Sequence, residues 1–157
     1  MFIKYKRTTS QIEPLQMFAK GEWIDLRLAE NISLSENEYT LASLGIRMDI
    51  PKEFEVIIVP RSGTFNKYGI MQANSVGVID SSYRGKNDIW KFPALATRAV
   101  FVPQNTRICQ FRIQPSQKAG VWTKLKWLFT DRVIFVEDEY LSEDVQDRGG
   151  FGSTGEM

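Results

Sequence analysis

The chain has 157 residues, of which 43% are hydrophobic and 25% charged, which fits one domain with a full core and excludes a disordered chain. Twenty Lys and Arg against nineteen Asp and Glu give a net charge of +1. This balance supplies no basic footprint for duplex nucleic acid, so we expect no direct nucleic-acid binding.

The residue types that are missing limit the chemistry. The sequence has no histidine, which excludes Ser-His-Asp and Cys-His catalysis and histidine-ligated zinc, so general-base work falls to a carboxylate. Cys109 is the single cysteine, and we expect a small buried hydrophobic residue in a reducing compartment. No apolar run approaches the eighteen residues of a membrane span, so we expect a cytoplasmic protein without membrane contact.

Most of the chain has the pattern of short strands separated by turns. Apolar, β-branched runs lie at residues 56–59, 76–79 and 99–102, and Gly or Pro recurs between them. Residues 107–113 alternate, which predicts Ile108 on one face of a strand and Cys109 on the other. Without an internal repeat or a linker, the sequence predicts an all-β sandwich, jelly roll or barrel in a single domain, 1–157.

An insertion at about 114–130 departs from this pattern. Its apolar residues have the spacing of one helix face: Val121, Trp122, Leu125, Leu128 and Phe129. We therefore expect either a short amphipathic helix near 116–130 or an ordered insertion without a helix. Its apolar face would pack against the core or another subunit, or would bind a protein partner.

The C-terminal segment, about 146–157, contains four of the eleven glycines. Such a stretch forms no stable regular structure alone, so we expect a flexible arm. Its glycines allow backbone N–H groups to converge on an anion, while Arg148, Ser153 and Thr154 add a charge and two hydroxyl donors. The pattern favours an arm that closes over phosphates; the alternative is a disordered hydrophilic tail.

Two polar clusters follow predicted strands. Arg61, Ser62 and Gly63 offer a planar fork, a hydroxyl and an unobstructed backbone N–H, all suited to phosphate, although such a turn is also common on surfaces. Asp80 ends another apolar run, and Tyr83 follows three residues later. Asp80 is the best general-base candidate; the alternative is that it stabilises a turn.

Five segments, in order, resemble the five motifs of the trimeric deoxyuridine triphosphate nucleotidohydrolases, the dUTPases. They are WIDLRLAE at 23–30, PRSGT at 60–64, GVIDSSYRG at 77–85, RICQFRI at 107–113 and RGGFGSTG at 148–155. The third and fourth are similar to the versions of Gram-positive bacteria and their phages.

The resemblance implies a distorted jelly roll, or β-clip, that hydrolyses dUTP to dUMP and diphosphate with Mg²⁺. Such an enzyme limits uracil incorporation into DNA and supplies dUMP. The resemblance also implies a homotrimer in which each active site draws on all three subunits, and in which the glycine-rich arm closes over a neighbour's site.

By this resemblance, Asp80 is the catalytic aspartate, which contacts the deoxyribose 3′-OH and aligns the water that attacks the α-phosphorus. Tyr83 lies under the deoxyribose and leaves no room for a 2′-OH. The uracil-reading hairpin corresponds to Asn74, Gly77, Val78 and Ile79. A backbone N–H is a donor only, so it binds uracil O4 and rejects the amino group of cytosine.

The resemblance assigns the phosphates to the second, fourth and fifth motifs. The residues are Arg61, Ser62, Gly63, Gln110, Arg148, Gly152, Ser153 and Thr154. Gln110 and Arg148 also count as catalytic. Asp25 corresponds to the first-motif acid in the outer shell of Mg²⁺, and no direct protein ligand is expected because the phosphates hold the ion.

The resemblance leaves open which aromatic residue stacks on uracil. Phe151 occupies the fifth-motif position, but that motif lacks residues that usually separate Arg-Gly from Gly-Phe-Gly. Trp90 and Phe92, just after the third motif, are the alternatives.

Two other functions stay open at this point. A dCTP deaminase of the same fold would resemble a site with a Glu soon after the third motif, and residues 86–96 contain none. A non-catalytic, nucleotide-dependent regulatory protein would use Trp122, Trp127 and Phe129 of the insertion as a partner surface, exposed or hidden as the arm orders.

Overall fold

The computed structural model describes residues 1–16, 22–130, 132–139, 141 and 146–150. Within these ranges the chain consists mainly of short strands. In chain order they are β1 (Phe2–Arg7), β2 (Ile24–Arg27), β3 (Ile32–Leu34), β4 (Tyr39–Ser43), β5 (Ile46–Met48), β6 (Phe54–Pro60), β7 (Ile70–Gln72), β8 (Gly77–Asp80), β9 (Lys91–Ala96), β10 (Val100–Val102), β11 (Arg107–Pro115) and β12 (Ile134–Glu137). The described helices are α1 (Thr64–Tyr68) and α2 (Val121–Leu128).

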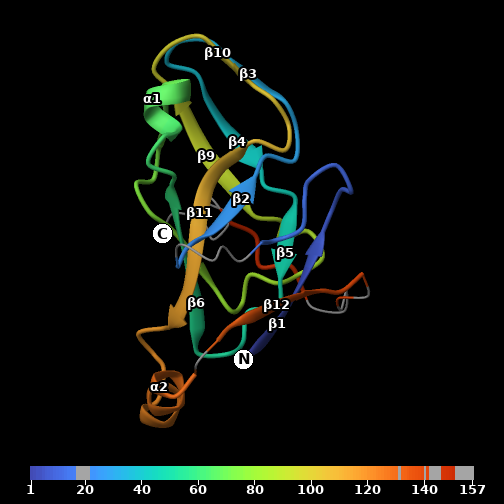
Figure 1. The fold of residues 1–157 in the computed structure, drawn as a ribbon, viewed down its shortest axis with the longest axis vertical. Helices are drawn as coiled ribbons and strands as arrows, with labels where there is room; N and C mark the ends of the chain where they lie inside the picture. Colours follow the sequence, from blue (N-terminus) through green and yellow to red (C-terminus); the bar gives the residue numbers. More distant parts are fainter. Residues whose placement is uncertain (17–21, 131, 140, 142–145, 151–157) are drawn as a thin grey trace.

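The strands form several small sheets, which confirms the all-β prediction. A four-stranded sheet has the order β2-β11-β6-β8, and two three-stranded sheets have the orders β4-β9-β7 and β12-β1-β5. In Figure 1, β6 and β11 run along the long axis, with α1 and α2 at opposite ends of this pair. None of the described helices is long and apolar enough to cross a membrane.

A line of aromatic rings joins these sheets through the core. Trp90 meets Phe111 of β11 edge to face, with ring centroids 5.4 Å apart, and Phe111 meets Phe135 of β12 in the same way at 5.4 Å. Trp90 and Phe111 are fully buried. Edge-to-face pairs add to the free energy gained from burying apolar area, so this line stabilises the packing of the sheets.

The start of β11 departs from simple alternation. Its register against β2 shifts between Arg107 and Cys109, and both Ile108 and Cys109 are fully buried. The prediction that Ile108 faces away from Cys109 is therefore wrong, because a bulge turns both side chains inward. The expected burial of Cys109 is confirmed, and this burial raises the pKa of its thiol well above the ordinary value.

The predicted helix in the insertion is present as α2, but a different residue holds it. Trp127 packs edge to face on Phe54 of β6, with ring centroids 5.5 Å apart. Glu53 accepts hydrogen bonds from the Gly120 backbone N–H (3.1 Å) and the Thr123 hydroxyl (2.5 Å) at the start of the helix. Trp127, expected on a partner surface, thus faces its own chain.

The apolar face predicted for α2 does not pack on the core of its own chain. Four of its side chains are between 75% and 78% exposed: Val121, Trp122, Leu128 and Phe129. The expectation of core packing is wrong for these residues, because the helix is anchored through Trp127 instead.

We expect Trp127→Ala to loosen α2. Loss of the ring contact should lower the free energy of unfolding by about 1 to 2 kcal/mol and the thermal midpoint by several degrees. Amide hydrogen exchange over 121–128 should become faster. Trp122→Ala is the matched control, and an equal loss of stability in both variants would contradict this account.

Candidate active site

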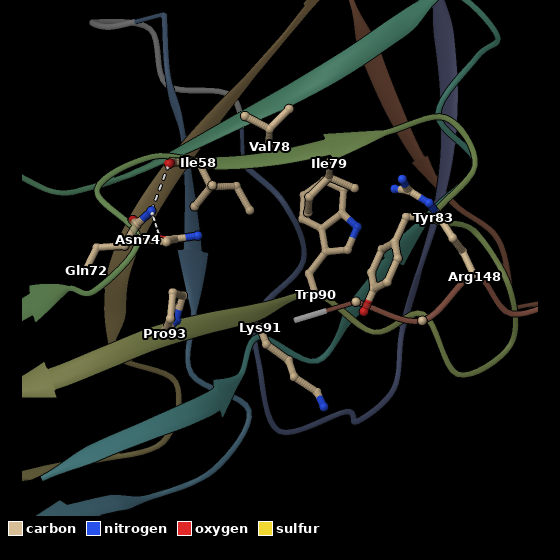
Figure 2. Close-up of a pocket in the computed structure, with 13 residues that line it drawn as sticks. Ile58, Gln72, Asn74, Val78, Ile79, Tyr83, Trp90, Lys91, Pro93 and Arg148 are labelled. Carbon is tan, nitrogen blue, oxygen red and sulfur yellow. Dashed lines mark hydrogen bonds between the residues drawn. The ribbon is translucent and has the colours of Figure 1, made fainter. Parts of the chain in front are cut away.

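A pocket of about 300 Å³ opens beside β8. Figure 2 shows that its walls come from several elements, with the turn between β7 and β8 at one end and Tyr83 with Arg148 at the other. The lining residues are Ile58, Gln72, Asn74, Gly77, Val78, Ile79, Tyr83, Trp90, Lys91, Pro93, Arg148, Gly149 and Gly150. The structure thus brings together the predicted hairpin residues, Tyr83 and Arg148.

The turn that joins β7 to β8, strands that pair with β9 and β6 respectively, presents backbone groups to a ligand. Ser75 has a φ of 60°, and a tight turn is closed by the bond from the Val76 N–H to the Asn74 carbonyl (2.6 Å). Gly77 pairs with Ile58 of β6, and a Cβ at Gly77 would lie 3.2 Å from the Ile58 Cβ. Because β8 is the edge strand of its sheet, its outer N–H and C=O groups pair with no further strand among the described residues.

The side chain of Asn74 is held by Gln72, a residue that the sequence did not indicate. The Gln72 amide nitrogen donates to the Ile58 carbonyl (3.3 Å) and to Asn74 Oδ1 (2.9 Å). The bond to Ile58 joins β7 to β6, which α1 separates in the chain, so pattern alone gave no signal for it.

Two aromatic rings form the other end of the pocket. The Tyr83 hydroxyl donates to the Ile89 carbonyl (3.1 Å), which fixes the ring, and burial raises the pKa of this tyrosine. Trp90 forms a fully buried wall, and its indole N–H has no hydrogen-bond partner within the described structure. A Cβ on Gly150 would lie 3.4 Å from the Tyr83 ring, so the base of the arm passes close over it.

The three residues predicted as alternatives for stacking on uracil differ in where they lie relative to the pocket. Phe92 is fully buried opposite Ala42 of β4 and does not line the pocket, so its predicted stacking role is wrong. Trp90 lines the pocket as part of the core wall rather than as a movable lid. Phe151 lies outside the described residues, as do Gly152, Ser153 and Thr154.

Asp80 lies at the end of β8 as a half-exposed carboxylate. Ser82 donates to its Oδ1 from both the backbone N–H (2.8 Å) and the hydroxyl (2.5 Å), and an Arg148 guanidinium nitrogen lies 2.6 Å from Oδ2. Burial alone would raise the pKa of Asp80, but the Ser82 bonds and the Arg148 charge outweigh it and lower that pKa. Asp80 is therefore ionised at neutral pH, and it also stabilises the turn after β8.

The base of the arm is anchored by a buried carboxylate, Asp88. It accepts hydrogen bonds from the backbone N–H groups of Gly85 (2.8 Å), Arg148 (3.0 Å) and Gly149 (3.0 Å) and is 1% exposed. A Cβ on Gly85 would lie 2.6 Å from the Cα of Asp147, so the loop needs glycine for this close approach. Through Gly150, the described part of the arm therefore lies on its own chain.

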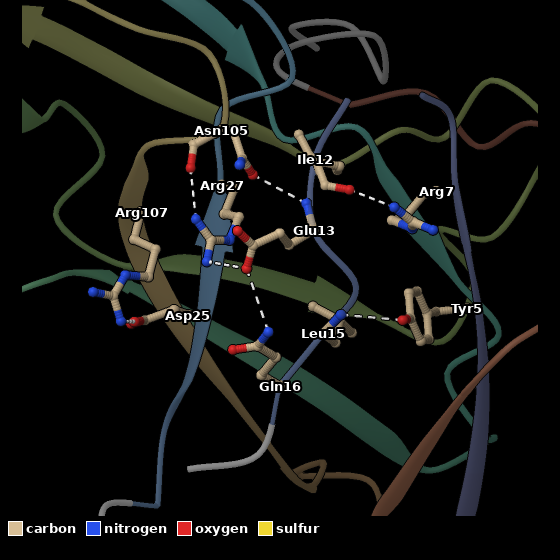
Figure 3. Close-up of polar contacts among 10 residues, drawn as sticks. All are labelled: Tyr5, Arg7, Ile12, Glu13, Leu15, Gln16, Asp25, Arg27, Asn105 and Arg107. Carbon is tan, nitrogen blue, oxygen red and sulfur yellow. Dashed lines mark hydrogen bonds and ion pairs between the residues drawn. The ribbon is translucent and has the colours of Figure 1, made fainter. Parts of the chain in front are cut away.

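A second group of predicted residues gathers around Asp25 of β2. The Arg61 Nε lies 2.8 Å from Asp25 Oδ1, and an Arg107 nitrogen lies 3.2 Å from Oδ2. Gln110 of β11 pairs with Asp25 in the sheet. Figure 3 shows Asp25 and Arg107 beside Arg27, which binds a Glu13 oxygen (2.8 Å). Asp25 thus holds Arg61 in place next to Gln110.

These two groups lie at opposite ends of β6. Asp80 pairs with Glu55 near one end of the strand, whereas Arg61 follows Pro60 at the other. At about 3.3 Å per residue, the six residues from 55 to 61 separate them by roughly 20 Å. Ser62 and Gly63 are exposed and stay with Arg61. One chain therefore does not bring its second-motif residues to Asp80.

Comparison with known proteins decides the family. The dUTPase family model matches residues 23–126. The chain is 40% identical, over 99% of both sequences, to the SPbeta prophage-derived deoxyuridine 5′-triphosphate nucleotidohydrolase YosS of Bacillus subtilis. This chain belongs to the dUTPase family. The prophage relative agrees with the predicted Gram-positive or phage type of dUTPase.

Other relatives and solved structures agree with this placement. The chain is 32% identical to the deoxyuridine 5′-triphosphate nucleotidohydrolase of a Thermoanaerobacter strain, over 99% of this chain and 98% of the relative. The dUTPase of Streptococcus mutans has a TM-score of 0.65 at 20% identity, covering 74% of this chain and 98% of that one. The Staphylococcus bacteriophage 80alpha dUTPase has a TM-score of 0.66 at 15% identity, covering 76% and 93%. These two structures have the dUTPase fold predicted from the sequence.

We expect Asp88→Ala to release the base of the dUTPase arm. The variant leaves three backbone N–H groups without their acceptor, so exchange of the Arg148 and Gly149 amides should become at least about tenfold faster. Gly85→Ala should act in the same direction through steric contact with Asp147.

Hydrogen exchange resolved to single amides measures this effect. Glu38→Ala is the control, since its carboxylate accepts a hydrogen bond from the Ser35 backbone N–H (2.7 Å) within the turn between β3 and β4. Unchanged protection of both amides in Asp88→Ala would show that the arm is held by other contacts.

Proposed function

We propose that this dUTPase hydrolyses dUTP to dUMP and diphosphate in the cytoplasm, with Mg²⁺. The single observation that carries the proposal is the ionised Asp80 carboxylate next to a pocket large enough for a nucleoside. Tyr83 lines the end of this pocket that lies nearest to Asp80. The activity would limit uracil incorporation into DNA and supply dUMP. The family model and the relatives named above are dUTPases, which disfavours the dCTP deaminase alternative.

The base and sugar would be held by the pocket. Backbone groups at the outer edge of Gly77, Val78 and Ile79 would pair with uracil, as one strand pairs with another. The Tyr83 ring, fixed by its bond to Ile89, would lie under the deoxyribose and exclude a 2′-OH. This seating would place the α-phosphate toward Asp80, where β8 ends.

The chemical step would be in-line attack by water. Asp80 would accept a hydrogen bond from this water and take its proton as the new P–O bond forms. The bond between the α-phosphorus and the bridging oxygen then breaks, and diphosphate leaves. Arg148 pairs with Asp80 in this structure, and its charge would stabilise the phosphates.

The phosphate residues of the second and fourth motifs would come from a neighbouring subunit. The separation along β6 keeps Arg61, Ser62, Gly63 and Gln110 away from Asp80 of their own chain. In a homotrimer with closed symmetry, each chain would give its Asp80 to one site and its Arg61 to another.

The residues around Asp25 are compatible with a magnesium ion held by the substrate. The described residues contain no group of three or more His, Cys, Asp or Glu that could form a metal cage, and both Asp25 oxygens face guanidinium groups. We propose that the phosphates provide the direct ligands and that Asp25 binds a water of the outer shell. The ion would neutralise phosphate charge. A solved structure of a mutant dUTPase from phage phi11 of S. aureus shows the coordination of a structural Mg(II) ion in that protein.

A second role, protein binding through the 114–130 insertion, is favoured by the exposed apolar face of α2. A pull-down that compares the full chain with a 116–130 deletion tests it. Equal recovery of all partners would contradict this role.

We expect diphosphate release with dUTP and Mg²⁺, and little with dCTP, dTTP or UTP. Asp80→Asn should keep dUTP affinity but lose at least about a hundredfold in turnover, because the amide cannot take the proton. Asp49→Asn is the control. Turnover near that of the unaltered enzyme in Asp80→Asn would contradict the proposed mechanism.

A mixing experiment tests the shared site. Asp80→Asn and Arg61→Ala should each be inactive alone, but co-expressed chains should regain activity in about a third of the sites of trimers that contain both variants. A site confined to one chain gives no recovery. Differently tagged chains, purified through both tags, provide the mixed species.

A further inference from the structure

Gln72 links a backbone carbonyl to the side chain at the base-reading end of the pocket. Its amide nitrogen donates to the Ile58 carbonyl (3.3 Å) and to Asn74 Oδ1 (2.9 Å), and the residue is 6% exposed. Figure 2 shows this chain of two bonds and the Asn74 amide nitrogen pointing toward the interior of the pocket.

The Ile58 carbonyl fixes which groups donate and which accept in this series of two hydrogen bonds. A backbone carbonyl only accepts, so the Gln72 amide must turn its NH₂ group toward Ile58. The same NH₂ group is the neighbour of Asn74, so Asn74 must offer its oxygen. The Asn74 NH₂ group is then left for the pocket. An isolated Asn side chain can rotate and show either group, whereas this one is held in one orientation.

The position that meets Asn74 follows from the layout of the pocket. Tyr83 and Arg148 lie at the end opposite the β7–β8 turn (Figure 2). With the sugar at Tyr83, the pyrimidine N1 points to that end, and C4, directly across the ring from N1, points to Asn74. Uracil has an oxygen acceptor on C4, whereas cytosine has an amino donor there. A fixed donor on Asn74 therefore favours uracil.

If Gln72 served only to fill space in the core, an amide side chain would be unfavourable there. Its Oε1 is buried and has no hydrogen-bond partner within the described structure. A buried, unpaired amide oxygen destabilises the folded state, and an apolar side chain of similar volume would avoid this penalty. The amide is explained if its donor group is needed to orient Asn74.

We propose that Gln72 is a specificity-determining positioning residue, which fixes the donor of Asn74 toward the base and so selects the 4-oxo group of uracil over the 4-amino group of cytosine. The proposal rests on the proposed dUTP hydrolysis. Gln72 acts through Asn74 and without contact to the reacting atoms.

Gln72→Met is the first test, because it keeps the volume and removes the amide. We expect the dUTP to dCTP ratio of kcat/KM to fall at least about tenfold, since Asn74 can then rotate and accept from cytosine. The dUTP to dTTP and dUTP to UTP ratios should stay unchanged, because they depend on the C5 and 2′ positions.

Gln104→Met is the matched control. The Gln104 amide nitrogen also joins a backbone carbonyl, that of Ala29 (2.5 Å), to a side-chain amide, that of Gln11 (2.6 Å), outside the pocket. All substrate ratios should stay unchanged in this variant. A uniform loss on all four nucleotides in Gln72→Met would indicate a structural role and overturn the proposal.

Asn74→Asp provides a second test that leaves Gln72 in place. One carboxylate oxygen can accept from Gln72, and the other then faces the base as an acceptor. Calorimetric binding of dUMP and dCMP should show preference moving from dUMP toward dCMP. Unchanged preference in both Asn74→Asp and Gln72→Met would overturn the proposal. Failure of the unaltered protein to hydrolyse dUTP would instead overturn the proposed function, and the monophosphate titration would still test the orientation of Asn74.

Discussion

The antiparallel pairing of β6 with β8 and β11 decides where chemistry can take place. Its register puts Asp80 opposite Glu55 and keeps Arg61 beyond Pro60, at the other end of the same strand. A strand is stiff and extended, so no rearrangement of loops within one chain brings these two residues to one phosphate chain. The proposed trimer follows from this distance and from the family together.

Charge is balanced locally at both ends of that strand. At one end Asp80 holds Arg148, and at the other Asp25 holds Arg61. Each arginine is therefore placed before any anionic ligand arrives, which reduces the conformational entropy that is lost on binding. Asp88 adds to this preorganisation because it holds the backbone on both sides of the Arg148 Cα through two N–H groups.

The sequence predicted those features that depend on local pattern. The strands at β6 and β8, the helix in the insertion and the polar residues that close the strands all follow from short-range periodicity and turn chemistry. Asp88 and Gln72 were missed because the contacts that bury them, with the backbone at Arg148 and Gly149 and with the Ile58 carbonyl, join segments that are distant in sequence. The inward turn of Ile108 was missed because a bulge breaks the period, and Phe92 was misplaced because an aromatic residue near a motif can serve the core as well as the ligand.

The double role of Trp90 limits how this protein can change during evolution. The indole is a wall of the pocket and the first ring of the aromatic line that joins the sheets. Enlarging the cavity at this position would remove packing on which folding depends, so variation that alters nucleotide choice is directed to the turn between β7 and β8. A new specificity is thus more accessible through the polarity of a few amide groups than through the shape of the cavity.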